Sequence, residues 1–171
     1  MKAVLLLLFL VTAMPADSFA GTPGETAIGS HLPEATLQGL FGKTKKFSDY
    51  RGKPLIINVW ASWCAPCRAE MGSLERLARR YNGKQFNIIG ISTDDDGNAA
   101  AAFIRKSGVS FENFLDSHVY LENMLGADMI PLTVLVDAEG HVLEKVHGAF
   151  EWDNPVIVKE IGETFGIKLN R

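Results

Sequence analysis

The chain has 171 residues, of which 47% are hydrophobic, and a formal net charge of −3 at pH 7. That length suits one domain with a sizeable core and is short for two. No block of like charge suggests a nucleic-acid-binding arm or a polybasic membrane patch, so no nucleic-acid partner is expected.

The first twenty residues differ from the rest of the chain. Lys2 precedes an apolar run over 3–13, and Ser18-Phe19-Ala20 places small residues at the two positions that a signal peptidase inspects. We therefore interpret residues 1–20 as a signal peptide, cleaved before Gly21. The alternative is an uncleaved N-terminal anchor, although the apolar run is shorter than the roughly 20 residues of a transmembrane helix. Both interpretations predict a periplasmic or otherwise exported protein.

The remainder is interpreted as a linker over residues 21–30 and one domain over 31–171, in which strand and helix signals alternate. In chain order we predict a hairpin over 36–40 and 44–47, a buried strand over 55–60, a helix over 66–81 and a second buried strand over 86–91. Residues 94–98 then open a helix that ends at 107, followed by a short strand over 113–115 and a short helix over 119–125. Paired strands over 132–136 and 141–146 and a helix from 155 complete the domain. This order predicts an α/β domain with a central mixed sheet.

The two cysteines of the chain, Cys64 and Cys67, are separated by only two residues. An exported protein stapled by disulfides usually spreads several cysteines along its length. A pair this close encloses almost no loop, so its entropic stabilisation of the fold is small. A chemical role therefore explains the pair better than stabilisation of the fold by a disulfide does.

The position of the pair predicts a different role for each of the two thiols. Cys64 lies at the start of the helix predicted from Pro66, where free backbone N–H groups and the helix dipole favour a thiolate and lower the pKa of its thiol. Cys64 is thus predicted to attack a substrate disulfide. Cys67, one helical turn further on, then releases the mixed disulfide by forming the intramolecular bond.

Two other interpretations of the pair are less favoured. A zinc site would need a second Cys or His pair at similar spacing. The four histidines are instead scattered singly: His31, His118, His141 and His147. Inert buried thiols are the other alternative, but a strand, a C-x-x-C motif and a helix in succession are typical of redox chemistry. No metal site is therefore predicted.

The ten residues from Asn58 to Cys67, NVWASWCAPC, resemble the active-site segment of the thioredoxin superfamily. They are most similar to the TlpA/ResA/DsbE branch of exported, usually reducing, thiol–disulfide oxidoreductases. The resemblance covers most of residues 28–168. It implies a thioredoxin fold, in which helices flank a central mixed β-sheet, with an N-terminal β-hairpin and an inserted segment after the second buried strand.

A second motif, MIPLTVLVD over residues 129–137, resembles the cis-proline strand of the same family. The resemblance implies that Pro131 is a cis-proline packed against the dithiol, and that Ile130 offers its backbone to a docked substrate by strand addition. Trp63 would supply apolar surface beside Cys64. Leu132 replaces a threonine of the family pattern, a departure that bears on partner specificity.

Simple thioredoxins carry a buried aspartate six residues before the first cysteine, whereas this chain has Asn58. Asn58 cannot take up a proton, so Cys67 needs another base. The resemblance implies an acidic residue near the end of the following strand, where Asp94 and Asp95 are the nearest matches. The alternative is that these aspartates only cap a helix and oppose its dipole.

The resemblance implies an enzyme that exchanges disulfides with client proteins, most often as a reductase, with apo-cytochrome c thiols as the commonest clients. It also implies recycling by a membrane electron donor of the thiol-relay type, and we expect a monomer. No cofactor is expected, because the electrons reside in the cysteines. Two alternatives are a peroxidase, which would use a lone attacking cysteine, and a non-enzymatic metal-binding or copper-delivery protein that uses Cys64, Cys67 and His147.

Overall fold

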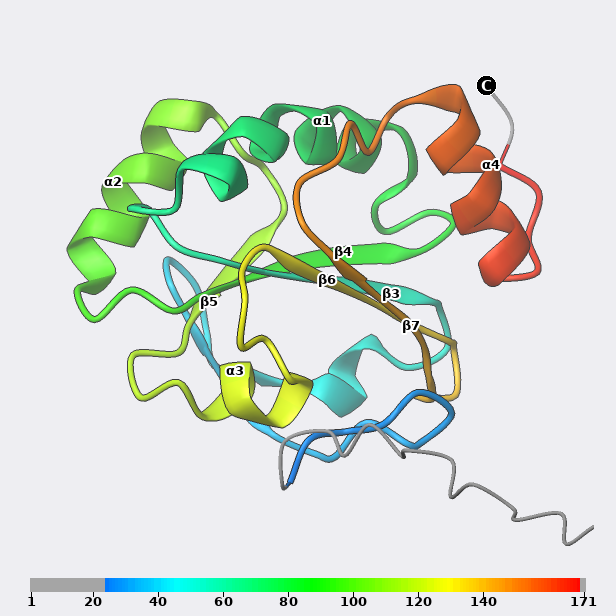
Figure 1. Cartoon of the computed structure of the whole chain (residues 1–171), viewed down its shortest axis with the longest axis horizontal. Coiled ribbons are helices and arrows are strands. Elements are labelled where there is room, and N and C mark those ends of the chain that lie inside the picture. Colours follow the sequence, from blue (N-terminus) through cyan, green and yellow to red (C-terminus); the bar gives the residue numbers. More distant parts are fainter. Residues whose placement is uncertain (1–23, 170–171) are drawn as a thin grey trace, which may run out of the picture.

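A computed structural model describes residues 24–169 of the chain (Figure 1). The predicted signal peptide, residues 1–20, lies outside the described residues. The elements in chain order are β1 (Thr36–Gly39), β2 (Lys45–Lys46), the short 3-10 helix η1 (Phe47–Tyr50), β3 (Leu55–Trp60), α1 (Ala65–Tyr81), β4 (Asn87–Ser92), α2 (Gly97–Ser107), β5 (Glu112–Leu115), α3 (Tyr120–Leu125), β6 (Leu132–Val136), β7 (Val142–His147) and α4 (Pro155–Thr164).

The strands form one seven-stranded sheet in the order β2-β1-β5-β4-β3-β6-β7. The three inner strands β5, β4 and β3 run parallel, and β6 and β1 add antiparallel partners on either side. The mixed sheet of a thioredoxin fold is therefore confirmed, with the predicted hairpin as β1 and β2. The segment inserted after β4 contributes α2, β5 and α3, and β5 joins the hairpin to the central strands.

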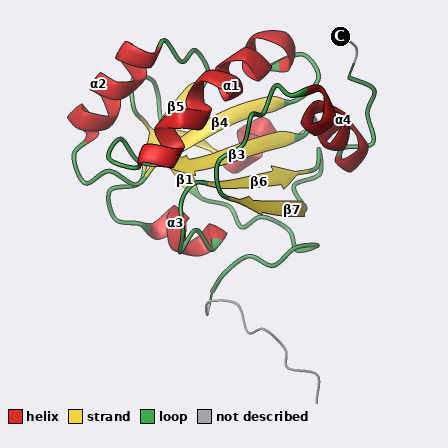
Figure 2. Ribbon diagram, turned by 45° about the horizontal axis from the view of Figure 1, so that its top comes forward, coloured by secondary structure: helices red, strands yellow, loops and turns green. Residues whose placement is uncertain are grey.

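Helices cover both faces of the sheet (Figures 1 and 2). α1, α2 and α4 lie on one face, and α3 and η1 lie on the other. Strand β3 contributes side chains to the hydrophobic cores on both faces of the sheet, because its side chains alternate in direction. Ile57 and Val59 join the core beneath α3, whereas Ile56 and Trp60 join the core beneath α1. Burial on both faces explains why this strand reads as a continuous apolar run.

Helix α1 begins directly after the first cysteine. Cys64 is its N-cap residue, with extended backbone, and Pro66 occupies the first turn, where its missing N–H is not needed. The apolar stripe of the helix packs on the sheet and includes Met71, Leu74 and Leu77. Among residues 24–169, none of the helices has the length and apolar character needed to cross a bilayer.

Residues before β1 pack against the edge strand β7. The backbone N–H of Gly29 donates to the carbonyl of Val142, whose own N–H donates to the carbonyl of Ser30. Glu25 forms an ion pair with Lys145 of β7, whose side chain is nearly buried. These contacts cover part of an edge that would otherwise offer free backbone groups.

One buried polar row crosses the sheet under α1. In register, Thr133 of β6 faces Asn58 of β3, Asn58 faces Gly90 of β4, and Gly90 faces Asn113 of β5. The indole N–H of Trp60 donates to Asn113 Oδ1 at 3.0 Å directly over Gly90. A Cβ at position 90 would lie 2.0 Å from that oxygen, so only glycine leaves room for this hydrogen bond.

We therefore expect Gly90→Ala to lower the free energy of unfolding by about 2–3 kcal/mol, through overpacking and loss of the Trp60–Asn113 hydrogen bond. Urea unfolding measures this change. Gly72→Ala in α1 is the matched control, because its Cβ would meet only Arg76 at 3.5 Å and alanine favours a helix. Equal effects at the two positions would contradict the prediction.

Candidate active site

The cysteine pair lies where β3 ends and α1 begins. Cys64 and Cys67 form a disulfide, with sulfur atoms 2.05 Å apart. The Cys67 backbone N–H donates to Cys64 Sγ at 3.2 Å, so the first turn of the helix directs an N–H at this sulfur. That donor and the helix dipole favour negative charge on Cys64 once the bond is reduced. Cys64 is 5% exposed and Cys67 is fully buried, so a partner can approach only the former.

The loop before β6 lies against the first sulfur. The Ile130–Pro131 peptide bond is cis, as the resemblance implies. The Ile130 carbonyl oxygen is 3.9 Å from Cys64 Sγ, although the two residues are 66 positions apart in sequence. They meet because β6 is antiparallel to β3, so the start of β6 lies beside the end of β3.

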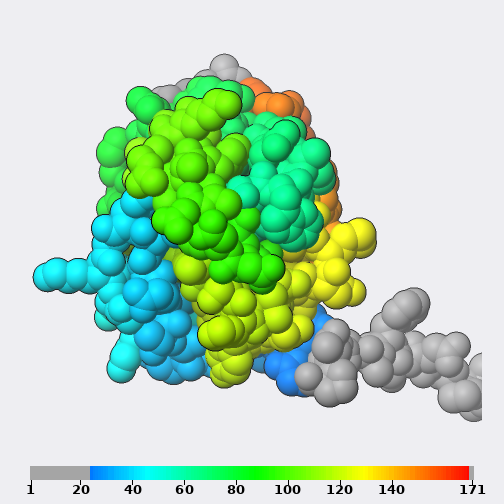
Figure 3. All heavy atoms as spheres, turned by 90° about the vertical axis from the view of Figure 1, so that its left-hand side faces the viewer, coloured from blue at the N-terminus to red at the C-terminus, as the bar shows by residue number. Residues whose placement is uncertain are grey.

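Two large apolar side chains project from this end of the molecule. Trp63 precedes the first cysteine and is 68% exposed, and Met129 precedes Ile130 and is 66% exposed. Figure 3 shows this end, with the start of α1 in teal beside the yellow segment that leads to β6. Exposed apolar groups next to a reactive centre are typical of a surface that contacts a partner.

Sequence reasoning missed a buried acid, Glu70, which is only 1% exposed. It follows Cys67 by three positions on α1, so the two side chains lie on the same face of the helix. Burial raises the pKa of the Glu70 carboxyl above its ordinary value of 4.5, and hydrogen bonds from Trp152, Asn58 and Phe150 partly oppose this effect. An acid within the apolar stripe of an amphipathic helix was the available sequence signal.

Asn58 lies directly beneath this carboxylate. Its side-chain amide donates to Glu70 Oε1 at 2.8 Å and to Thr133 Oγ1 at 3.0 Å. All three side chains are buried, and the Asn58 Oδ1 atom has no hydrogen-bond partner among the described residues. The position that carries an aspartate in simple thioredoxins here supports a carboxylate supplied by α1.

Asp94 and Asp95, the predicted acid–base candidates, differ sharply in environment. Asp94 is buried, and its carboxylate accepts hydrogen bonds from the Ser62 N–H at 2.8 Å, the Ser62 hydroxyl at 2.6 Å and the Ser92 hydroxyl at 2.7 Å. Asp95 is exposed, and Asp96 caps α2 by accepting from the Asn98 N–H. Asp94 therefore joins the loop before Cys64 to the end of β4.

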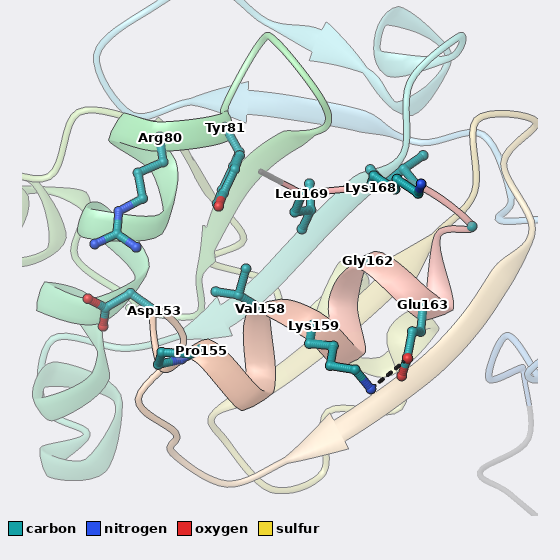
Figure 4. A pocket seen from close by; sticks show the side chains of 12 residues that line it. Arg80, Tyr81, Asp153, Pro155, Val158, Lys159, Gly162, Glu163, Lys168 and Leu169 are labelled. Atoms are coloured by element: carbon teal, nitrogen blue, oxygen red, sulfur yellow. Dashed lines mark ion pairs between the residues drawn. The ribbon is translucent and has the colours of Figure 1, made fainter. Parts of the chain in front are cut away.

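A groove of about 1170 Å³ lies at the far end of α1, between Tyr81, α4 and the C-terminal segment near Leu169 (Figure 4). The helical rise places Tyr81 roughly 21 Å from Cys67, so this groove takes no part in dithiol chemistry. Within residues 24–169, no three His, Cys, Asp or Glu side chains are grouped to hold a metal ion. The metal-binding alternative, including the role suggested for His147, gains no support from this geometry.

A dithiol at the N-terminus of a helix, beside a cis-proline strand on a mixed sheet, defines a thiol–disulfide oxidoreductase of thioredoxin fold. Comparison with known proteins agrees. The AhpC/TSA family matches residues 28–145. The thiol-disulfide oxidoreductase ResA of Geobacillus thermodenitrificans is 30% identical over 151 residues, which cover 86% of each chain.

Solved structures give the same result. The thioredoxin domain of a thiol-disulfide oxidoreductase from Bacteroides vulgatus is 25% identical, with a TM-score of 0.68 over 80% of this chain and 99% of that chain. A thiol-disulfide oxidoreductase from Bacteroides fragilis is 26% identical, with a TM-score of 0.66 over 77% of this chain and 99% of that chain. The chain belongs to the AhpC/TSA family and, within the thioredoxin superfamily, to the TlpA/ResA/DsbE-like thiol–disulfide oxidoreductases.

We expect Asp94→Ala to lower the free energy of unfolding by about 2–4 kcal/mol, because three donors around a buried carboxylate lose their acceptor. Asp95→Ala should change it by less than about 0.5 kcal/mol, since that side chain is exposed. Urea unfolding of the oxidised proteins compares the two variants. Similar losses in both would show that the Asp94 hydrogen bonds do not anchor this loop.

Glu70 should give the stability a pH dependence of definite sign. Between 4.5 and the raised pKa of Glu70, the folded state keeps a proton that the unfolded state releases, so stability falls as pH rises through that window. The slope is at most about 1.4 kcal/mol per pH unit. Urea unfolding at a series of pH values should show this fall in the wild type relative to Glu70→Gln. A difference that stays flat or grows with pH would disprove it.

Proposed function

We propose that the protein is an exported reductase of client disulfides, in which Cys64 is the nucleophile, Cys67 the resolving thiol and Glu70 the acid–base group. The observation that carries the proposal is a dithiol at the start of α1 with a buried carboxyl group one turn further along the same helix. The reducing direction, export, a thiol-relay donor in the membrane and apo-cytochrome c as a client are supported by the resemblance to the TlpA/ResA/DsbE branch.

The proposed cycle transfers two electrons. The reduced Cys64 thiolate attacks a client disulfide and forms a mixed disulfide, and one client sulfur leaves as a thiolate that takes a proton. Cys67 gives its proton to the ionised Glu70 carboxylate, and its thiolate attacks Cys64 Sγ. The Cys64–Cys67 bond forms, the mixed disulfide breaks, and the second client sulfur leaves. The client gains the two electrons that the protein dithiol loses.

Glu70 is better suited than Asp94 or Asp95 to receive the Cys67 proton. It lies on the same helix face as Cys67, whereas the Asp94 carboxylate faces Ser62 of the loop before Cys64 and Ser92 at the end of β4. The raised pKa of Glu70 also brings its proton affinity closer to that of a thiol, which favours proton transfer near neutral pH. Asp94 then serves to hold the loop that carries the nucleophile.

Client docking is proposed at the surface formed by Trp63, Met129 and Ile130. An extended client segment can pair with the backbone at Ile130, and this places its disulfide near Cys64 Sγ, which lies 3.9 Å from the Ile130 oxygen. Trp63 and Met129 offer apolar contact on either side. Main-chain pairing with flanking apolar contacts suits an unfolded client better than a rigid folded one.

The test is to equilibrate the purified protein in graded thiol/disulfide buffers and to read its redox state by mass-shift alkylation. We expect a two-electron transition that Cys64→Ser abolishes, and a mixed disulfide with a client peptide that accumulates in Cys67→Ser. A midpoint near −270 mV supports a reductase, whereas one near −120 mV would indicate an oxidant. If no two-electron transition appears and the thiols react only after a chelator is added, the redox proposal fails and metal binding takes its place.

A further inference from the structure

The segment that follows β7 is bound to α1 beside the active site. The Trp152 backbone N–H donates to Ser73 Oγ at 3.0 Å, and the Ser73 hydroxyl donates to the Phe150 carbonyl at 3.1 Å. The Trp152 side chain is 2% exposed and packs edge to face with Phe150. Two backbone groups of this segment are thus fixed on the same turn of α1 that carries Glu70.

The same segment also reaches the Glu70 carboxylate. The Trp152 indole N–H donates to Glu70 Oε2 at 2.8 Å, and the Phe150 backbone N–H donates to the same oxygen at 3.2 Å. The Asn58 amide donates to Oε1 at 2.8 Å. Every one of these groups is a donor, so together they stabilise the ionised carboxylate against the burial that opposes it.

Charged side chains near this site are directed elsewhere. Glu151 and Asp153, on the segment itself, pair with Arg76 one and a half turns further along α1. From the sheet, the groups beneath Glu70 are the neutral Asn58 and Thr133. On α1 itself, the titratable group on the same face is Cys67, three positions before Glu70. Burial therefore raises the pKa of the Glu70 carboxyl, and the donated hydrogen bonds, that of Trp152 foremost, act against this effect.

We propose that Trp152 is a positioning residue for the acid–base step: its indole N–H holds the Glu70 carboxylate toward Cys67 and sets the pH at which that carboxylate can accept the thiol proton. The inference rests on the proposed acid–base function of Glu70. An indole N–H can only donate, so it favours the carboxylate over the carboxylic acid and returns the group to its ionised form after each proton transfer.

The proton balance follows from this arrangement. The Cys67 S–H bond breaks and a Glu70 O–H bond forms, which leaves a thiolate on Cys67 and a neutral carboxyl group on Glu70. The thiolate then forms the bond to Cys64 Sγ and the client thiolate departs. Glu70 returns the proton to the departing thiolate or to water, and the indole hydrogen bond to a full carboxylate is restored.

The test compares Trp152→Phe, which keeps a ring but removes the donor, with Trp60→Phe as the matched control. Trp60 is also fully buried, but its indole N–H donates to Asn113 at 3.0 Å and not to Glu70. With ¹³C-labelled glutamate in the full chain, NMR titration measures the Glu70 carboxyl. We expect its midpoint to rise by about one pH unit in Trp152→Phe and to stay unchanged in Trp60→Phe.

The pH profile of mixed-disulfide resolution, measured in a single turnover with a disulfide-bonded peptide, should rise by the same amount in Trp152→Phe alone. Equal shifts in the two variants, or none, would overturn the inference. If the Glu70 carboxyl shifts while the resolution profile does not, Trp152 still controls Glu70, and it is the acid–base function of Glu70 that fails.

A second measurement needs no substitution at Trp152. In the wild type, the indole ¹H–¹⁵N signal of Trp152 should titrate with the same midpoint as the Glu70 carboxyl, and this titration should disappear in Glu70→Gln. A Trp152 signal that is constant across the Glu70 transition would refute the inference, even where Trp152→Phe does not fold.

Discussion

A carboxylate placed in the core beneath α1 has to be fully hydrogen-bonded, and much of the site follows from this requirement. The Glu70 carboxylate accepts hydrogen bonds from the Asn58 amide of β3, the indole N–H of Trp152 and the backbone N–H of Phe150. To supply the last two donors, the segment after β7 has to lie across α1, and Ser73 fixes it there. A buried charge without such partners would cost several kcal/mol. The need for donors thus links the sheet, the catalytic helix and the C-terminal third of the chain.

The same network explains the substitution at position 58. In simple thioredoxins the sheet supplies a buried aspartate, whereas here the buried acid comes from α1 and the sheet supplies an amide. Two acids at this depth would oppose each other's ionisation, because like charges at close range in a poorly solvated site cannot both be stable. An amide at position 58 with an acid at position 70 is therefore a consistent pair.

The fold could be read from the sequence because its signals are local. Continuous apolar runs marked β3 and β4, and the stripe from Met71 to Tyr81 marked α1, each within a residue or two of the observed bounds. The cysteine pair could be assigned to redox chemistry from its position between a predicted strand and a predicted helix. The cis peptide bond before Pro131 came from the family resemblance and not from any local propensity.

The pairing of Glu70 with Trp152 was beyond sequence reasoning because it is a contact across 82 positions. Glu70 falls within the apolar stripe of α1, but nothing local indicates that Trp152, in the loop before α4, is its partner. The aspartates after β4 stood out in sequence because they are consecutive, yet only Asp94 is buried, and its partners are the serines of the neighbouring loop. Which of these acids is buried depends on tertiary packing and cannot be read from the amino-acid composition.

The position of Ile130 beside Cys64 has a consequence for the newly made chain. The two residues are 66 positions apart, and they meet only after β6 has paired with β3 in the centre of the sheet. A chain whose synthesis has not passed β6 holds both thiols but lacks the strand that brings Ile130 to Cys64. During biogenesis both cysteines are therefore present before their surroundings are complete, and folding of the C-terminal half places Ile130 beside Cys64.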